Sequence, residues 1–244
     1  MTLIGRTRAR GVETLTLDSP ANRNALSAAL VGELADTLTD CGKDSDIRAV
    51  VLTHTGTTFC AGADLRDPPH PDTLVGLLRQ IVELPKPVVA RVTGHVRAGG
   101  LGLLAACDIA AASDAATFAF TEVRIGVAPA VISLTLLPRT DPRALARHYL
   151  TGERFDATEA ARIGLLTATG DDVDDVLAPV LDSLRKAAPQ ALTETKRLLT
   201  ARVLETFDRD AAHLTALSAR MFASADAREG MTAFLERRDP PWVL

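Results

Sequence analysis

Apolar and polar residues alternate near the start of the chain, and apolar residues then recur with a different spacing. The segment 12–17, VETLTL, has the alternation of a half-buried strand. Directly after it, Leu26, Leu30, Leu34 and Leu38 recur every fourth residue, as on one face of a helix. The N-terminal part therefore predicts a strand followed by a helix.

Three further apolar runs predict buried strands, at residues 49–52, 87–92 and 107–111. The stretches between them have helical character. Alternation of strands and helices is typical of parallel strands that are joined by helical crossovers. We therefore expect an α/β core.

Helix start and stop signals follow in the second half. Asp141-Pro142 predicts an N-cap with proline at the first helical position. Asp156 predicts a second N-cap, with Glu159 placed to return a capping bond. Gly164 is expected to end that second helix.

No strand signal follows Pro189, and the apolar residues mark three helical faces, at 192–203, 214–221 and 231–235. The sequence thus predicts an α/β core over residues 1–187 and a helical region over residues 188–244. This region carries much apolar surface, so we expect it to pack on the core or on a neighbouring subunit.

Composition excludes several classes of protein. The 244 residues are 47% apolar and 24% charged, as in ordinary globular proteins. The net charge is −4 and the sequence has no basic stripe, so nucleic acid is not an expected partner. No signal-peptide core begins the chain, and the apolar stretch 101–112 is too short to span a membrane. Three cysteines without CxxC spacing argue against a disulfide framework or a zinc site. We expect a soluble, cytoplasmic protein.

Two small-residue turns carry the candidate chemistry. One is TFCAGADL at 58–65, and the other is GHVRAGGLG at 94–102, followed by ACDI at 106–109. Such turns bring backbone N–H groups close to a ligand. Two of them, from separate loops, can converge on one oxygen and stabilise it as it becomes an oxyanion.

In this order, the two turns resemble the enoyl-CoA hydratase/isomerase (crotonase) superfamily. The resemblance extends to PANRNAL at 20–26 and to residues 222–235, and so covers nearly the whole chain. It implies a core of repeated ββα turns, a C-terminal helical region that covers the active site, and assembly into trimers or dimers of trimers. It also implies an acyl-CoA thioester substrate and no metal or redox cofactor.

The resemblance also assigns catalytic roles. The backbone N–H groups of Ala63 and Gly99 would hold the thioester oxygen as an enolate, and Glu122 would be the acid/base. A carboxyl group between apolar stretches is costly to bury, and burial should raise its pKa toward neutrality. The competing interpretation is that Glu122 forms a structural ion pair with Arg124 or Arg97.

Several residues are candidate contacts for coenzyme A. Arg23 matches a basic position that the family places near the entrance, and Lys196 and Arg197 on the C-terminal region could reach phosphate. The remaining candidates lie in the two small-residue turns: Ala61, Gly62, Asp64, Leu65 and Gly100.

Gly102 departs from the family pattern, because two-glutamate hydratases carry their first glutamate there. A glycine can neither take a proton nor hold a water with a side chain. Glu122 alone could catalyse hydration of a 2-enoyl-CoA, which we favour, or Δ3-Δ2-enoyl-CoA isomerisation. Another acyl chemistry that uses the same two turns, or a non-catalytic acyl-CoA binder, would also fit these residues.

Overall fold

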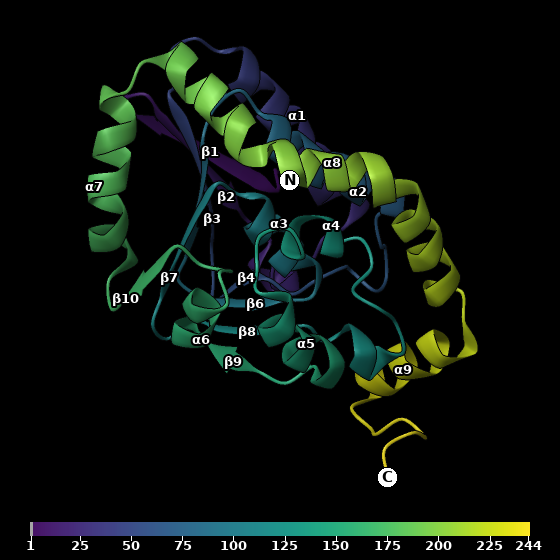
Figure 1. Cartoon of the computed structure of the whole chain (residues 1–244). Coiled ribbons are helices and arrows are strands. Elements are labelled where there is room, and N and C mark those ends of the chain that lie inside the picture. The colour runs from purple at the N-terminus through teal and green to yellow at the C-terminus, as the bar shows by residue number, and fades with distance from the viewer. Residues whose placement is uncertain (1) are drawn as a thin grey trace.

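Two β-sheets form the centre of the molecule (Figure 1). The structure is a computed structural model and describes residues 2–244. The larger sheet has the order β1-β2-β3-β5-β7-β10, and β1 is its one antiparallel strand. The smaller sheet has the order β4-β6-β8-β9, with β9 antiparallel. The strands are β1 Ile4–Ala9, β2 Val12–Leu17, β3 Ala49–His54, β4 Thr58–Cys60, β5 Val88–Val92, β6 His95–Arg97, β7 Ile109–Ser113, β8 Thr117–Ala119, β9 Phe155–Asp156 and β10 Ala168–Gly170.

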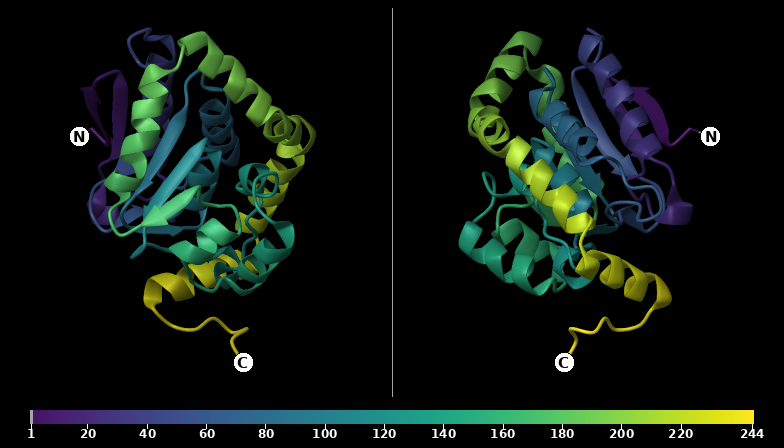
Figure 2. Two further views of the ribbon diagram at one scale, coloured as in Figure 1. Left: turned by 60° about the vertical axis from the view of Figure 1, so that its left-hand side comes forward. Right: turned by 90° about the vertical axis from the view of Figure 1, so that its right-hand side faces the viewer.

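Helices surround the sheets and make up the C-terminal part (Figures 1 and 2). Two of them, η1 and η2, are short 3-10 helices. The helices are η1 Pro20–Asn22, α1 Ala28–Lys43, α2 Pro71–Glu83, α3 Gly99–Ala106, η2 Glu122–Ile125, α4 Ser133–Leu136, α5 Pro142–Thr151, α6 Ala157–Arg162, α7 Val173–Lys186, α8 Pro189–Phe222 and α9 Ala225–Glu236.

The core is built from a repeated ββα unit. A strand of the larger sheet is followed by a strand of the smaller sheet and then by a helix, as in β3–β4–α2 and β5–β6–α3. The third unit, β7–β8, leads into η2. The predicted α/β core of ββα turns followed by a helical region is confirmed.

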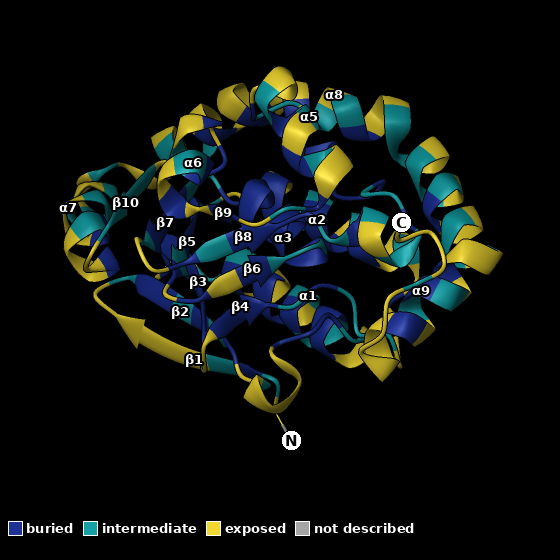
Figure 3. Cartoon of the chain, turned by 90° about the horizontal axis from the view of Figure 1, so that it is seen from below, coloured by how far each residue is buried: buried dark blue, intermediate teal, exposed yellow. Residues whose placement is uncertain are grey.

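The predicted apolar face at the start of the chain is buried as expected. Leu26, Leu30, Leu34 and Leu38 are each at most 1% exposed and belong to the main hydrophobic core. Every residue of β3 is buried, which is typical of a central parallel strand. Figure 3 shows these central strands buried and β1 exposed at the sheet edge.

Two elements differ from the sequence-based expectation. The faces predicted at 192–203 and 214–221 lie on one continuous helix, α8, because no glycine and no internal proline interrupts residues 189–222. Strand β1 was not expected, since its sequence IGRTRA is polar. It pairs with β2 along its whole length, and Arg6 and Arg8 both bond Glu13 of that strand, at 2.9 and 2.7 Å.

The two predicted N-caps are present. The Asp141 carboxylate accepts the N–H groups of Arg143 and Ala144, and Asp156 Oδ1 accepts the N–H of Glu159 at 2.8 Å. The predicted return bond from Glu159 is wrong. Its carboxylate bonds Arg162, at 2.6 and 2.7 Å, because that cation lies one helical turn further on.

A buried ion pair fastens α8 to the core. Lys196 is 5% exposed, and its Nζ lies 2.8 Å from Asp108 Oδ2. The same Nζ donates to the carbonyl oxygens of Ile81 and Lys86, at 2.8 and 3.0 Å. Lys196 is therefore fully engaged inside the protein, and the expectation that it reaches phosphate is wrong.

Substitution of Lys196 tests this attachment. Lys196→Met removes the cation and leaves Asp108 partly buried without it, so we expect a loss of about 3 kcal/mol or more of unfolding free energy. The control is Arg197→Met, because Arg197 is exposed and pairs with Glu194 on the surface, where a loss below about 1 kcal/mol is expected. Urea unfolding measures both, and equal losses would contradict the role of Lys196.

Candidate active site

The first small-residue turn is held against the segment that precedes α1. Leu26 pairs with Ala63 in an isolated parallel bridge. The N–H of Leu26 donates to the Gly62 carbonyl at 2.8 Å, and the N–H of Asp64 donates to the Leu26 carbonyl at 2.9 Å. These two bonds leave the N–H of Ala63, which lies between them, pointing away from that segment.

The second turn meets the first where α3 begins. Ala98 has a φ of 45°, in the region that favours glycine, and it precedes Gly99, the first residue of α3. A Cβ atom added to Gly62 would lie 2.9 Å from Cβ of Ala98, and one added to Gly99 would lie 3.8 Å from the nitrogen of Ala63. Gly62, with a φ of +97°, therefore lets the two loops touch.

The two predicted amide donors are thus brought together and are unused by the protein. Within residues 2–244, neither the N–H of Ala63 nor that of Gly99 donates a hydrogen bond to a protein acceptor. The N–H of Gly99 is also at the positive end of the α3 dipole. Two adjacent, preorganised donors of this kind can stabilise an oxygen that gains negative charge.

Glu122 begins η2, directly after strand β8 of the smaller sheet. Its side chain is buried, and its Oε2 atom has no hydrogen-bond partner among the described residues. Burial raises the pKa of Glu122 to about 7. A carboxyl group with such a pKa can both accept and return a proton near neutral pH.

The interpretation of Glu122 as part of a structural ion pair is wrong. Arg124 donates from Nε to the Thr151 carbonyl at 3.3 Å. Arg97 bonds the hydroxyl and the carbonyl of Thr117 on the neighbouring strand. Neither arginine forms a salt bridge with Glu122, so the carboxylate has no counter-ion within the part of the chain that the structure describes.

The hydroxyl groups of Tyr149 and Ser133 were missed by the sequence reasoning. The Tyr149 ring contacts the Phe120 ring at a centroid distance of 4.6 Å, and its hydroxyl lies 3.2 Å from Oγ of Ser133. Burial, with a contribution from the Glu122 carboxylate, raises the pKa of Tyr149 above its usual range. The four-residue spacing of Leu145 and Tyr149 on α5 was the available signal that Tyr149 faces inward.

Helix α9 packs directly on the segment that carries Glu122. A Cβ atom added to Gly230 of α9 would lie 2.5 Å from backbone atoms of Ile125, and one added to Gly126 would lie 2.5 Å from the Asp226 carbonyl oxygen. The absence of both side chains therefore permits backbone-to-backbone contact. The C-terminal helix, at the lower edge of the molecule in Figure 1, fixes one side of η2.

Gly102 is closely packed by an apolar side chain. A Cβ atom added to it would lie 2.5 Å from Cγ2 of Ile132 and 3.0 Å from Cβ of the same residue. Helix α4 is also close to this point, because the Thr135 hydroxyl lies 3.1 Å from the carbonyl oxygens of both Gly102 and Ile132. Ile132 therefore fills the space that a larger residue at position 102 would need.

Most of the residues predicted to contact coenzyme A lie around the first turn, whereas Lys196 and Arg197 lie on α8. The Arg23 carbonyl accepts the N–H of Ala61 at 3.1 Å, and the Asn22 side chain lies 3.4 Å from Asp64 Oδ2. Arg23 is exposed, and Leu65 is partly exposed on the same loop. Gly100 is buried, and a Cβ atom added to it would lie 2.6 Å from Cβ of Cys60.

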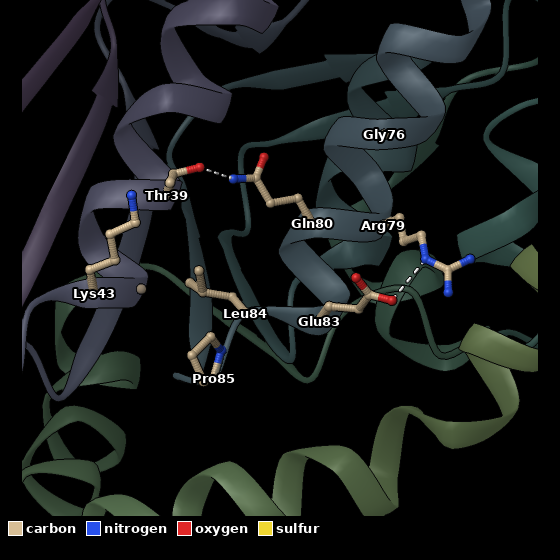
Figure 4. A pocket seen from close by; sticks show the side chains of 9 residues that line it. Thr39, Lys43, Gly76, Arg79, Gln80, Glu83, Leu84 and Pro85 are labelled. Carbon is tan, nitrogen blue, oxygen red and sulfur yellow. Dashed lines mark hydrogen bonds and ion pairs between the residues drawn. The ribbon is translucent and has the colours of Figure 1, made fainter.

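A surface groove between α1 and α2 is separate from this constellation. Figure 4 shows its lining, where Gln80 bonds Thr39 and Arg79 bonds Glu83. None of the residues that line it is a predicted site residue. The convergent amides and the buried carboxyl group therefore identify the candidate active site.

The chain is similar to known proteins over nearly its whole length. The sequence profile of the Enoyl-CoA hydratase/isomerase family matches residues 7–243. The crystal structure of an enoyl-CoA hydratase from Mycobacterium avium is 50% identical, covers 100% of both chains and superposes with a TM-score of 0.93. The 1,2-epoxyphenylacetyl-CoA isomerase of Escherichia coli K12 is 32% identical over 96% of this chain and 95% of its own. The (E)-benzylidenesuccinyl-CoA hydratase of Thauera aromatica is 29% identical over 94% of each.

Packing at Gly102 leads to a prediction about stability. Gly102→Ala forces the new methyl group against Ile132, so we expect a loss of about 1–3 kcal/mol of unfolding free energy. The double substitution with Ile132→Ala should lose less unfolding free energy than the two single substitutions together, because the shorter side chain at 132 makes room for the new methyl group. Thermal and urea unfolding measure this double-mutant cycle.

Gly32→Ala is the matched control, since a Cβ atom at this helical glycine would meet nothing within 4 Å. It should leave stability unchanged or raise it by up to about 1 kcal/mol. Strict additivity of the Gly102 and Ile132 substitutions would contradict the assigned contact.

Proposed function

The chain belongs to the enoyl-CoA hydratase/isomerase family, and on this premise we propose that it catalyses the reversible hydration of a 2-enoyl-CoA thioester. The observation that carries the proposal is Glu122, a buried carboxyl group without a counter-ion whose pKa is about 7. The chain also has two adjacent backbone donors, at Ala63 and Gly99, that make no hydrogen bond within residues 2–244. Together they provide one acid/base and one site for an enolate oxygen.

The two backbone donors act on the thioester oxygen. When a nucleophile adds to C3, the electrons of the C2–C3 double bond move toward the carbonyl, and its oxygen becomes an enolate. The N–H groups of Ala63 and Gly99 would stabilise this charge more strongly than the neutral carbonyl of the substrate. Removal of one such donor typically raises the barrier by about 3 kcal/mol.

Glu122 would move the proton in both halves of the reaction. Its carboxylate takes a proton from water as the water oxygen bonds to C3. The resulting carboxylic acid then returns that proton to C2, and the enolate becomes the thioester of a 3-hydroxy acid. One molecule of water is consumed, and Glu122 ends in its starting state.

Isomerisation of a 3-enoyl-CoA to a 2-enoyl-CoA is the second candidate. The contact of Ile132 with Gly102 favours it, because an apolar side chain occupies the place where a second carboxylate would stand. Isomerisation needs only one base, which removes a proton from C2 and returns it to C4. The same Ala63, Gly99 and Glu122 would carry it out.

Coenzyme A would bind along the first turn. We propose that Arg23 contacts its phosphates near the entrance and that Ala61, Gly62, Asp64, Leu65 and Gly100 line the path to the thioester. Arg23 supports this role by its exposure and by its backbone bond to Ala61. Acid–base chemistry on an activated thioester needs no metal or redox cofactor, and we propose none.

We also propose that the protein assembles into a homo-oligomer, a trimer or a dimer of trimers. Large apolar side chains on the C-terminal helices support this, since Leu198 and Leu199 of α8 are 80% and 75% exposed. Phe234 and Leu235 of α9 are exposed as well.

No helix within residues 2–244 is long and apolar enough to cross a membrane.

Spectrophotometry of two substrates tests the proposed reaction. Hydration predicts loss of the conjugated enoyl absorbance with crotonyl-CoA, with kcat/KM rising as pH passes through about 7, because Glu122 must be ionised to act as the base. Glu122→Gln should lower the rate about 10³-fold and abolish this pH dependence.

The second substrate separates the two candidates. Gain of the conjugated absorbance with 3-hexenoyl-CoA, without change of crotonyl-CoA, would replace the hydratase assignment with the isomerase. A Glu122→Gln variant as active as the wild-type protein would contradict both.

A further inference from the structure

A chain of hydrogen bonds leads from Tyr149 through Ser133 to a backbone carbonyl. Oγ of Ser133 lies 2.6 Å from the carbonyl oxygen of Pro129, and a carbonyl can only accept. The single hydroxyl hydrogen of Ser133 is therefore committed to Pro129. In the 3.2 Å contact between Ser133 and Tyr149, the tyrosine must then be the donor.

This direction leaves the phenol oxygen of Tyr149 with acceptor capacity only. A phenol has one O–H hydrogen, and here it is given to Ser133. Its remaining lone pairs can accept a hydrogen bond, as the oxygens of a carboxylate do. Tyr149 thus offers one function of the glutamate that is missing at position 102, although it cannot supply negative charge.

The elements that carry the two hydroxyl groups border both parts of the site. Ser133 begins α4 and directly follows Ile132, the residue packed on Gly102. Tyr149 is near the end of α5, which packs against η2, where Arg124 bonds the Thr151 carbonyl. The hydroxyl pair therefore joins the element beside Gly102 to the element beside Glu122.

The surroundings of Tyr149 fix its position. Its ring packs on Phe120, two residues before Glu122, at a centroid distance of 4.6 Å and an interplanar angle of 65°. The carboxylate of Glu122 contributes to the raised pKa of Tyr149, so the phenol stays protonated while Glu122 titrates. The Tyr149 hydroxyl therefore keeps donating to Ser133, and its oxygen stays free to accept a hydrogen bond.

We infer that Tyr149 orients the water that attacks C3, with its phenol oxygen accepting one water hydrogen while Glu122 takes the other. This role rests on the hydration proposed above. The water oxygen bonds to C3, the proton taken by Glu122 goes to C2, and the hydrogen that faces Tyr149 remains on the new hydroxyl group. Ser133 is the positioning residue that keeps Tyr149 an acceptor.

Two reactions separate this role from general damage to the site. Hydration of crotonyl-CoA needs the oriented water. Exchange of the C2 hydrogens of butyryl-CoA in D₂O, followed by mass spectrometry, needs only Glu122 and the two backbone donors. The variants are Tyr149→Phe and Ser133→Ala.

Tyr149→Phe should lower kcat for hydration about 10- to 100-fold, the effect of one lost hydrogen bond to a reacting group, with KM nearly unchanged. Its rate of C2 exchange should stay within about twofold of the wild-type rate. Ser133→Ala should also lower the rate of hydration and leave the rate of C2 exchange near the wild-type rate, because the Tyr149 hydrogen loses its acceptor. Glu122→Gln should lose both reactions.

Ser183→Ala is the matched control. Ser183 also donates to the carbonyl of a proline four residues earlier, Pro179, at 2.8 Å, but it lies on the exposed surface of α7. Ser183→Ala should hydrate crotonyl-CoA and exchange the C2 hydrogens of butyryl-CoA at the wild-type rates.

Wild-type hydration by Tyr149→Phe would overturn the role of Tyr149 and leave the hydratase assignment intact. A parallel loss of hydration and exchange in this variant would overturn it as well, since the residue would then be structural. A wild-type protein that exchanges C2 hydrogens but hydrates nothing would instead remove the proposed function, and this role with it.

Discussion

The burial of one carboxyl group without a counter-ion is the constraint on which the site depends. Removing a carboxylate from water disfavours its charged form, and at Glu122 neither arginine nearby in sequence offsets this cost. The result is a pKa of about 7, at which the acid and the base forms are both populated near neutrality. The family needs a group that takes and returns a proton, and burial alone gives this chain such a group.

The rest of the fold keeps Glu122 and the two backbone donors in place. Gly126 and Gly230 let α9 lie backbone to backbone on η2, and Gly62 lets the two small-residue turns touch. The long helix α8 leads into α9, and the ion pair between Lys196 and Asp108 attaches α8 to the segment that follows α3. The C-terminal region is thereby attached to the core at two places, beyond the C-terminal end of α3 and at η2.

The sequence predicted the parts of the fold that depend on periodicity and on local motifs. The four leucines before and within α1, the N-caps at Asp141 and Asp156, and the alternation of strands and helices were predicted because each leaves a local pattern. The ββα unit was expected only from the family resemblance. Strands β4, β6 and β8 are only three residues long, so they carry no alternation that could be recognised. The hydrogen-bonding roles of Lys196 and Tyr149 could not be predicted, because their partners, Asp108 and Ser133, come from other elements. A basic residue on a helix has the same local pattern whether it faces water or a buried carboxylate.

The most direct test of this account is a titration of Glu122 itself. Carbon-13 NMR of protein labelled at the glutamate carboxyl carbon follows each group with pH, and the Glu122→Gln variant assigns the signal. The account predicts a signal that titrates near pH 7, well above the ordinary glutamate value of 4.5, and is missing from the variant. A Glu122 signal that titrates at the ordinary value would show a solvated carboxylate and would contradict the central role of its burial.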